Sequence, residues 1–209
     1  RFTVDRHLWE AAANAAALVH RVQRPDLLVL GALFHDLGKG WPGDHSVVGI
    51  DLVRQIGPRL CIAPADVDTL AVLVEHHLLL PDVAVRRDLS DPATIRRVAD
   101  AVRDELTLDL LHALTEADSL ATGQSAWGSW KEQLVAELVD RTRALLRGGD
   151  GRLDHTGTRF PDDVTLSTMA AGRIDVRVER DDDDGTGTER VTVVSPDRPG
   201  TFARVAGVL

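Results

Sequence analysis

The stretch Leu33-Phe34-His35-Asp36-Leu37-Gly38-Lys39-Gly40 places an imidazole and a carboxylate side by side at the end of an apolar run. Glycines, which break helices, follow directly and flank a lysine. A His-Asp pair alone is a common dipeptide. It gains weight here because other histidines and acids fall at compatible places in the chain. These are His7, His45, His76, His77 and Asp118.

Composition limits the classes of protein that this chain can represent. Its 209 residues are 44% hydrophobic but 4% aromatic, which favours one aliphatic, mainly helical domain plus a smaller part. The net charge of −9 argues against broad nucleic-acid binding, which needs a basic face. No apolar run reaches the length of a membrane span, and no signal peptide is recognisable. A single cysteine, Cys61, excludes an internal disulfide and suits a reducing, cytoplasmic compartment.

The ends of the chain suggest a piece of a longer protein. Residue 1 is an arginine rather than a methionine, and the chain stops at Leu209, within an expected helix. We therefore expect domains beyond this sequence.

Helix signals dominate the first part of the chain. Apolar residues at helical spacing, capping residues and prolines or glycines at the ends predict seven helices. They are expected at 5–23, 27–37, 44–56, 64–80, 92–105, 106–122 and 126–146, with a loop at 81–90. The sequence thus predicts a helical domain over residues 1–148.

The character of the sequence changes after Gly149. A polar linker is expected at 150–162 and an acidic, solvated turn at 180–189. Short runs with β character predict strands, and Thr201 is placed to cap a following helix. The strands are expected at 164–167, 174–178 and 191–194. The fold class is therefore mainly α, followed by a small β-rich α+β segment, with linker and strands over 149–189 and the start of another domain over 190–209.

Several metal-capable side chains fall on the inward faces of separate predicted helices. Asp118 follows the apolar stripe of Leu111 and Leu114, where an isolated carboxylate is costly unless it is paired or bound to a cation. Taken singly, each such histidine or acid is better explained as a hydrogen-bonded core residue, or as a residue at the end of an apolar stripe whose side chain reaches water. Taken together, they favour one open metal site of imidazole and carboxylate ligands. Such ligands suit Mg, Mn, Fe or Zn, and a divalent cation there would lower the pKa of bound water and polarise a phosphoryl oxygen.

The order His7, His35-Asp36, Asp118 resembles that of the HD-domain phosphohydrolases. The resemblance implies an all-helical HD domain in which these four side chains hold a divalent metal. The flanking sequences are more specific and resemble the HD domain of the bifunctional uridylyltransferase/uridylyl-removing enzymes that act on the PII nitrogen-signalling protein. The flanking sequences that carry this resemblance are residues 3–7, 34–40, 43–46, 74–77 and 114–119.

A second resemblance covers the last part of the chain. Residues 191–203 are similar to the first strand, ligand loop and helix start of an ACT domain, which the chain leaves incomplete. In that family two ACT domains sense glutamine. The resemblance therefore implies glutamine as an effector of the full-length parent protein rather than of this truncated segment.

The resemblance also implies roles for individual residues. Lys39 is expected to stabilise charge on the phosphoryl group, with a solvated loop lysine as the equal alternative. His45, His76 and His77 are expected to bind a second metal, contact phosphate or act as general acid. Glu75 and Glu116 fit hydrogen-bond partners of the ligands or plain surface charges. The arginines at 86, 87, 96 and 97 are expected either to meet the PII protein or to be simply solvated.

The function implied is hydrolysis of the phosphodiester between a nucleoside monophosphate and a tyrosine of PII. The intact relative would also carry a nucleotidyltransferase domain. Two alternatives stay open at this point: an HD-type alarmone hydrolase, and a catalytically inactive HD/ACT regulatory module. The sequence does not separate UMP from AMP as the group removed, and it leaves the number of metals open.

Overall fold

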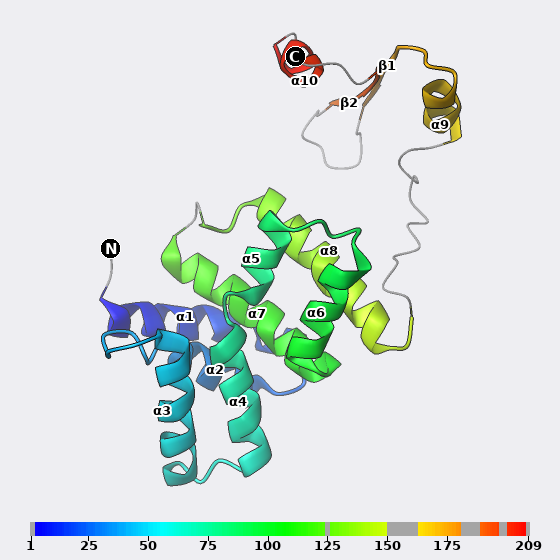
Figure 1. The fold of residues 1–209 in the computed structure, drawn as a ribbon. Coiled ribbons are helices and arrows are strands. Elements are labelled where there is room, and N and C mark those ends of the chain that lie inside the picture. Colours follow the sequence, from blue (N-terminus) through cyan, green and yellow to red (C-terminus); the bar gives the residue numbers. More distant parts are fainter. Residues whose placement is uncertain (1–2, 124–125, 150–162, 181–188, 197–199, 208–209) are drawn as a thin grey trace. The chain divides into compact units, whose positions relative to one another are not determined.

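The computed structural model describes residues 3–123, 126–149, 163–180, 189–196 and 200–207. They fall into two compact units, Arg1–Leu153 and Asp154–Leu209. The first unit is helical and the second combines helices with a small sheet (Figure 1). The expected linker at 150–162 and nearly all of the acidic turn at 180–189 lie outside the described residues. The prediction of a mainly α chain with a small β segment is confirmed.

The first unit is a bundle of eight α-helices and one short 3₁₀ turn within its described residues. Its elements are α1 Val4–Leu18, η1 Val19–Arg21, α2 Pro25–Phe34, α3 His45–Arg59, α4 Pro64–His76, α5 Leu79–Arg86, α6 Pro92–Val102, α7 Glu105–Thr122 and α8 Ser129–Leu146. Helix α7 packs against α1, α2, α4, α5, α6 and α8, whereas α3 packs mainly on α4 (Figure 1).

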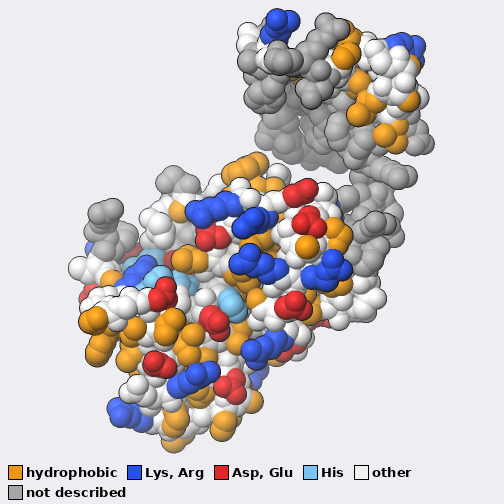
Figure 2. Space-filling view, viewed as in Figure 1, with side chains coloured by type: hydrophobic (Ala, Val, Ile, Leu, Met, Phe, Trp, Pro, Cys, Tyr) orange, Lys and Arg blue, Asp and Glu red, His pale blue; other side chains and the backbone are white. Residues whose placement is uncertain are grey.

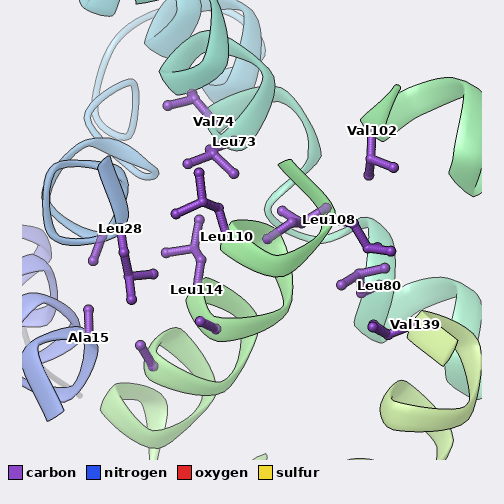
Figure 3. Packing of buried hydrophobic residues seen from close by; sticks show 14 of the residues in the cluster. Ala15, Leu28, Leu73, Val74, Leu80, Val102, Leu108, Leu110, Leu114 and Val139 are labelled. Atoms are coloured by element: carbon purple, nitrogen blue, oxygen red, sulfur yellow. The ribbon is translucent and has the colours of Figure 1, made fainter. Parts of the chain in front are cut away.

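The core is aliphatic, as the scarcity of aromatic residues predicts. Leu110 and Leu114 of α7 are fully buried and lie between Leu28 of α2 and Leu73 of α4 (Figure 3). Burying one such side chain contributes on the order of 2 kcal/mol. The stripe of buried leucines on α7 therefore fixes the faces that α1, α2 and α4 present to one another, and these helices carry the candidate ligands.

The prediction for residues 64–90 is wrong in one respect. Instead of one helix to residue 80 and a loop, α4 ends at His76 and α5 begins at Leu79. Pro81 does not end a helix because it is the third residue of α5. In the first turn of a helix the backbone N–H has no intrahelical acceptor, so proline is tolerated there.

Other helix boundaries also differ from the predictions, and α6 and α8 are each three residues shorter than predicted. Helix α1 gives way to the 3₁₀ turn at Val19 instead of reaching residue 23. Helix α2 ends at Phe34, so His35 and Asp36 belong to a tight turn in which Lys39 N–H donates to the Asp36 carbonyl. Helix α3 continues through Pro58 to Arg59, since a proline in the last turn disrupts little of the hydrogen-bond ladder.

The second unit contains α9 Asp163–Ala170, β1 Asp175–Arg180, β2 Glu189–Val194 and α10 Thr201–Ala206. The two strands pair antiparallel, with Asp175 opposite Val194 and Arg180 opposite Glu189. The strands expected at 174–178 and 191–194 and the helix after Thr201 are confirmed. The prediction of a strand at 164–167 is wrong, because this segment belongs to α9. In this helix the Thr168 hydroxyl donates a hydrogen bond to the Val164 carbonyl.

Within the ranges described, no helix combines the length and the hydropathy needed to cross a lipid bilayer.

Candidate metal centre

Six side chains from the first unit converge at one end of the bundle. They come from α1, from the turn after α2, from the first residue of α3, from the residue after α4, and from α7. The six are His7, His35, Asp36, His45, His77 and Asp118. Figure 2 shows histidine side chains gathering over the region where α1 and α3 approach each other. Five separate segments of the chain thus supply a single cluster.

The cluster consists of two groups of potential ligand atoms. One group is His7, His35 and Asp118, and the other is Asp36, His45 and His77; within each group the ligand atoms lie within 4.8 Å of one another. In the first group, His7 Nε2 lies 2.9 Å from Asp118 Oδ1 and 3.3 Å from His35 Nε2. Each group has the number and type of protein ligands found in open divalent-metal sites.

Asp36 lies between the two groups. Its Oδ2 lies 3.5 Å from His35 Nε2 and 3.7 Å from His7 Nε2. Its Oδ1 lies 3.5 Å from His77 Nε2 and 3.9 Å from His45 Nε2. One oxygen of the carboxylate therefore faces each group, an arrangement that allows this side chain to bridge two cations.

Two buried polar atoms in the cluster have no hydrogen-bond partner in the described part of the chain. Asp36 Oδ1 and His45 Nε2 are buried without a hydrogen bond to any described residue. Leaving such groups unsatisfied is costly unless something else, such as an ion, pairs with them. The two orphaned atoms belong to the same group, so the residues present fit a cation on that side.

Backbone carbonyls fix the orientation of two of the imidazoles. His35 Nδ1 lies 2.9 Å from the Ala32 carbonyl, and His77 Nδ1 lies 2.7 Å from the Val74 carbonyl. Because a carbonyl oxygen only accepts hydrogen bonds, each of these Nδ1 atoms carries a hydrogen and donates it. The other ring nitrogen, Nε2, then points into the cluster. Such hydrogen bonds set the tautomer of metal-ligating histidines.

Helices α1 and α7 are held together beside their ligands. Asn14 Nδ2 donates to the Ala117 carbonyl at 3.1 Å, directly before Asp118. The small, fully buried Ala11 and Ala15 on the same face allow the helices to approach closely. The distance between His7 and Asp118 is thereby determined by helix packing.

The charges of the cluster are strongly coupled. Burial works against the charged form of His35, but hydrogen bonds with Asp118 and Asp36 outweigh it and raise the pKa of His35 to about 9. Burial likewise opposes ionisation of Asp36, yet His35 and Lys39 lower its pKa to about 2. The pKa of Asp118 is also held well below its usual range, against the effect of burial, by His35 and His7. Burial lowers the pKa of His77, which favours its neutral, metal-binding form.

These shifts predict proton release when a cation binds. The pKa of His35 is raised from its ordinary value of 6.5 to about 9. Without metal, the imidazolium therefore stabilises the fold fully below about pH 6.5, and this stabilisation is lost as the pH rises through about 9. A cation needs the neutral Nε2 and must displace this proton. At about pH 7.5 we expect added Mn²⁺ to release protons into weakly buffered solution, measured with an indicator dye. Binding of Mn²⁺ at about pH 7.5 without proton release would contradict the role of His35.

The candidate residues occupy different places. Lys39 forms an ion pair with Asp36 and lines a pocket of about 410 Å³ together with His7, His77 and Asp118. His76 does not join the cluster. It lies in a neighbouring pocket, with Nε2 3.9 Å from Glu75 Oε2, because consecutive residues at the end of a helix point in different directions. Glu116 pairs with Arg21 at 2.6 Å instead of with a ligand.

Sequence reasoning left the shape of the site open in one respect. It treated His45 and His77 as candidates for several roles and did not foresee that Asp36 faces both groups. The adjacent histidines at 76 and 77 indicated only that one of the two could face a common site, and not which one.

Gly38 allows the turn after α2 to lie against the first turns of α3. A Cβ added there would lie 1.9 Å from the His45 carbonyl oxygen and 2.7 Å from the Gly49 backbone nitrogen. Because both are backbone atoms, Gly38→Ala must move the turn away from α3. We expect a loss of at least about 1–3 kcal/mol in the free energy of unfolding and a lower metal content, measured by thermal unfolding and elemental analysis.

The matched control for this variant is Gly128→Ala, where an added Cβ meets nothing within 4 Å. If Gly38→Ala retained the stability and metal content of the control, the close packing of turn and helix would not position Asp36 against His45.

Comparison with known proteins identifies the class. The HD domain family model matches residues 4–122, which include all six clustered side chains. The chain belongs to the HD domain family.

Comparison with individual proteins shows a more specific similarity. The chain is 59% identical over 147 residues to the bifunctional uridylyltransferase/uridylyl-removing enzyme of Streptomyces coelicolor, a match that covers 70% of this chain and 18% of that protein. It is 47% identical to the enzyme of the same name from Mycobacterium tuberculosis over 100% of this chain and 25% of that protein. The match to the Ruegeria pomeroyi enzyme is 30% identical, over 100% of this chain and 29% of the relative. The chain therefore spans less than a third of the length of these curated relatives.

Proposed function

We propose that this chain is a divalent-metal-dependent phosphodiesterase that releases a nucleoside monophosphate from a tyrosine of the PII protein. The observation that carries the proposal is the pair of ligand groups that share Asp36. Its particular substrate is supported by the relatives, whose names describe uridylyl removal. An adenylyl group in place of uridylyl is compatible with the same site.

The proposed site would hold two divalent cations. His7, His35 and Asp118 would hold the first, His45 and His77 the second, and Asp36 both. Imidazole and carboxylate ligands suit Mg or Mn, and also Fe or Zn. When bound, such cations lower the pKa of water and neutralise the charge that develops on phosphoryl oxygens.

The side chains around the pocket position the diester. Lys39 is half exposed at the pocket wall, so its ammonium group can reach a phosphoryl oxygen as well as Asp36. Hydrolysis forms a bond from a water oxygen to phosphorus and breaks the bond from phosphorus to the tyrosine oxygen. The departing phenolate has an ordinary pKa of about 10 and takes up a proton. Because His45 is assigned to the second cation, this proton comes from solvent in the pocket.

The proposal extends to the organisation of the whole protein. Residues 1–148 would form the HD phosphohydrolase domain, 149–189 a linker with strands, and 190–209 the start of an ACT domain. The parent protein would add the same nucleotidyl group through a domain outside this chain and respond to glutamine through complete ACT domains.

A small diester tests the chemistry without the protein substrate. Bis(p-nitrophenyl) phosphate should be hydrolysed by this chain with Mn²⁺ or Mg²⁺, and chelator should stop the reaction. Release of p-nitrophenolate is followed by absorbance. Failure of a metal-loaded, folded preparation to hydrolyse the diester would favour an inactive regulatory module over an enzyme.

A further inference from the structure

A second pocket adjoins the metal pocket. It has a volume of about 330 Å³ and is lined by the end of α4, by α5 and by Arg97 of α6. Leu78 lines both pockets, so the two share a rim. The consecutive histidines divide between them, with His77 in the metal pocket and His76 in the second one. A molecule bound in the metal pocket would therefore lie next to the second pocket, beside Leu78.

Three arginines outnumber the two acids, Glu75 and Asp82, in the lining of the second pocket. Arg86 pairs with Asp82 at 3.6 Å. Arg87 and Arg97 also line this pocket, and their side chains have no ion pair or hydrogen bond with any residue that the structure describes. Arg87 and Arg97 also line a neighbouring pocket of about 200 Å³. Figure 2 shows Lys and Arg side chains gathering over α5 and α6, on a chain whose net charge is −9.

The chemistry of the proposed substrate identifies the anion that this pocket suits. A nucleotidyl-tyrosine diester has one negative charge, on the phosphate that belongs at the metal centre. Its nucleoside is neutral. A second anion must therefore come from the polypeptide that carries the tyrosine, and carboxylates are the anionic side chains of an unmodified polypeptide. The planar guanidinium group binds a carboxylate with two parallel hydrogen bonds.

We propose that the pocket lined by Arg86, Arg87 and Arg97 holds a carboxylate side chain of the protein substrate, near the modified tyrosine. This inference rests on the proposed function and adds a basis for selectivity. The metal centre acts on the diester, and the arginine pocket selects the diester that is attached to a suitable protein. A free nucleotide diester lacks the second anion and gains nothing from this pocket.

The test compares two substrates in one variant. The double variant Arg87→Gln/Arg97→Gln removes both unpaired charges and retains much of each side chain. We expect the ratio of kcat/KM for uridylylated PII to kcat/KM for bis(p-nitrophenyl) phosphate to fall about tenfold or more, mainly through KM for the protein. The matched control is Arg54→Gln, an exposed arginine on α3 that lines neither pocket, and its ratio should stay within about twofold of wild type.

Salt provides a second readout. The wild-type KM for uridylylated PII should rise with ionic strength more steeply than that of the double variant, because exposed ion pairs are screened. An unchanged ratio with equal salt dependence would overturn the inference while leaving the proposed function intact. A wild-type chain that hydrolyses bis(p-nitrophenyl) phosphate but not uridylylated PII would overturn both. Hydrolysis of guanosine bis(diphosphate) that depends on Arg87 and Arg97 would instead assign the pocket to a second phosphate group.

Discussion

Asp36→Ala is expected to abolish both metal binding and phosphodiester hydrolysis while leaving the helical content of the chain largely unchanged. Asp36 is buried, faces both ligand groups and forms an ion pair with Lys39. Without it no carboxylate lies between the groups, and Lys39 loses the acid that holds it at the pocket wall. We expect a fall in kcat/KM on the order of a thousandfold, since a metal contributes several kcal/mol to the transition state and about 1.4 kcal/mol corresponds to a factor of ten.

The measurements for this variant are metal content, bis(p-nitrophenyl) phosphate hydrolysis and circular dichroism. Asp51→Ala is the matched control, because Asp51 is an exposed acid on α3 outside both groups. An Asp36→Ala protein that hydrolyses the diester at the wild-type rate would show that the site has been assigned to the wrong residues.

His77→Asn is expected to reduce the metal content from two cations per chain to one and to lower activity by about a hundredfold. Asparagine keeps an N–H donor near the Val74 carbonyl but lacks the Nε2 atom that lies 3.5 Å from Asp36 Oδ1. The group of His7, His35 and Asp118 stays complete. The variant therefore separates the two cation sites, and elemental analysis of the purified protein counts them.

The neighbouring residue supplies the control. His76→Asn changes the same side chain one position earlier, outside both ligand groups, and should retain two cations per chain. A His76→Asn protein with one cation and a His77→Asn protein with two would reverse the roles that the geometry gives these histidines.

The sequence predicted the helical bundle well because its signals are local. Apolar spacing and first-turn prolines predicted α4 and α6, which begin at Pro64 and Pro92. Helix α2 also begins at a proline, Pro25, two residues before the predicted start. The boundary at His76 was missed because Pro81, which suggested the end of a helix, is instead compatible with the first turn of the next one. The segment 164–167 was misread because its β-branched residues are also accommodated in a helix, with the Thr168 hydroxyl bonded to the Val164 carbonyl.

The site was only partly accessible to sequence reasoning. The periodicity of α7 placed Asp118 beside the buried Leu114, and the glycines at 38 and 40 marked a break shortly after His35 and Asp36. That one oxygen of Asp36 faces each ligand group depends on the tight turn and on the contact between Gly38 and α3, which are tertiary features. No local signal indicates which of two adjacent histidines points toward that carboxylate.

The most direct test of the central claim is release of UMP from uridylylated PII by this chain, measured by chromatography with Mn²⁺ present and again with chelator. The account predicts UMP and unmodified PII in equal amounts with Mn²⁺, and neither when chelator is added. UMP release that persists undiminished in chelator, or its absence from a preparation that contains two cations per chain, would contradict it.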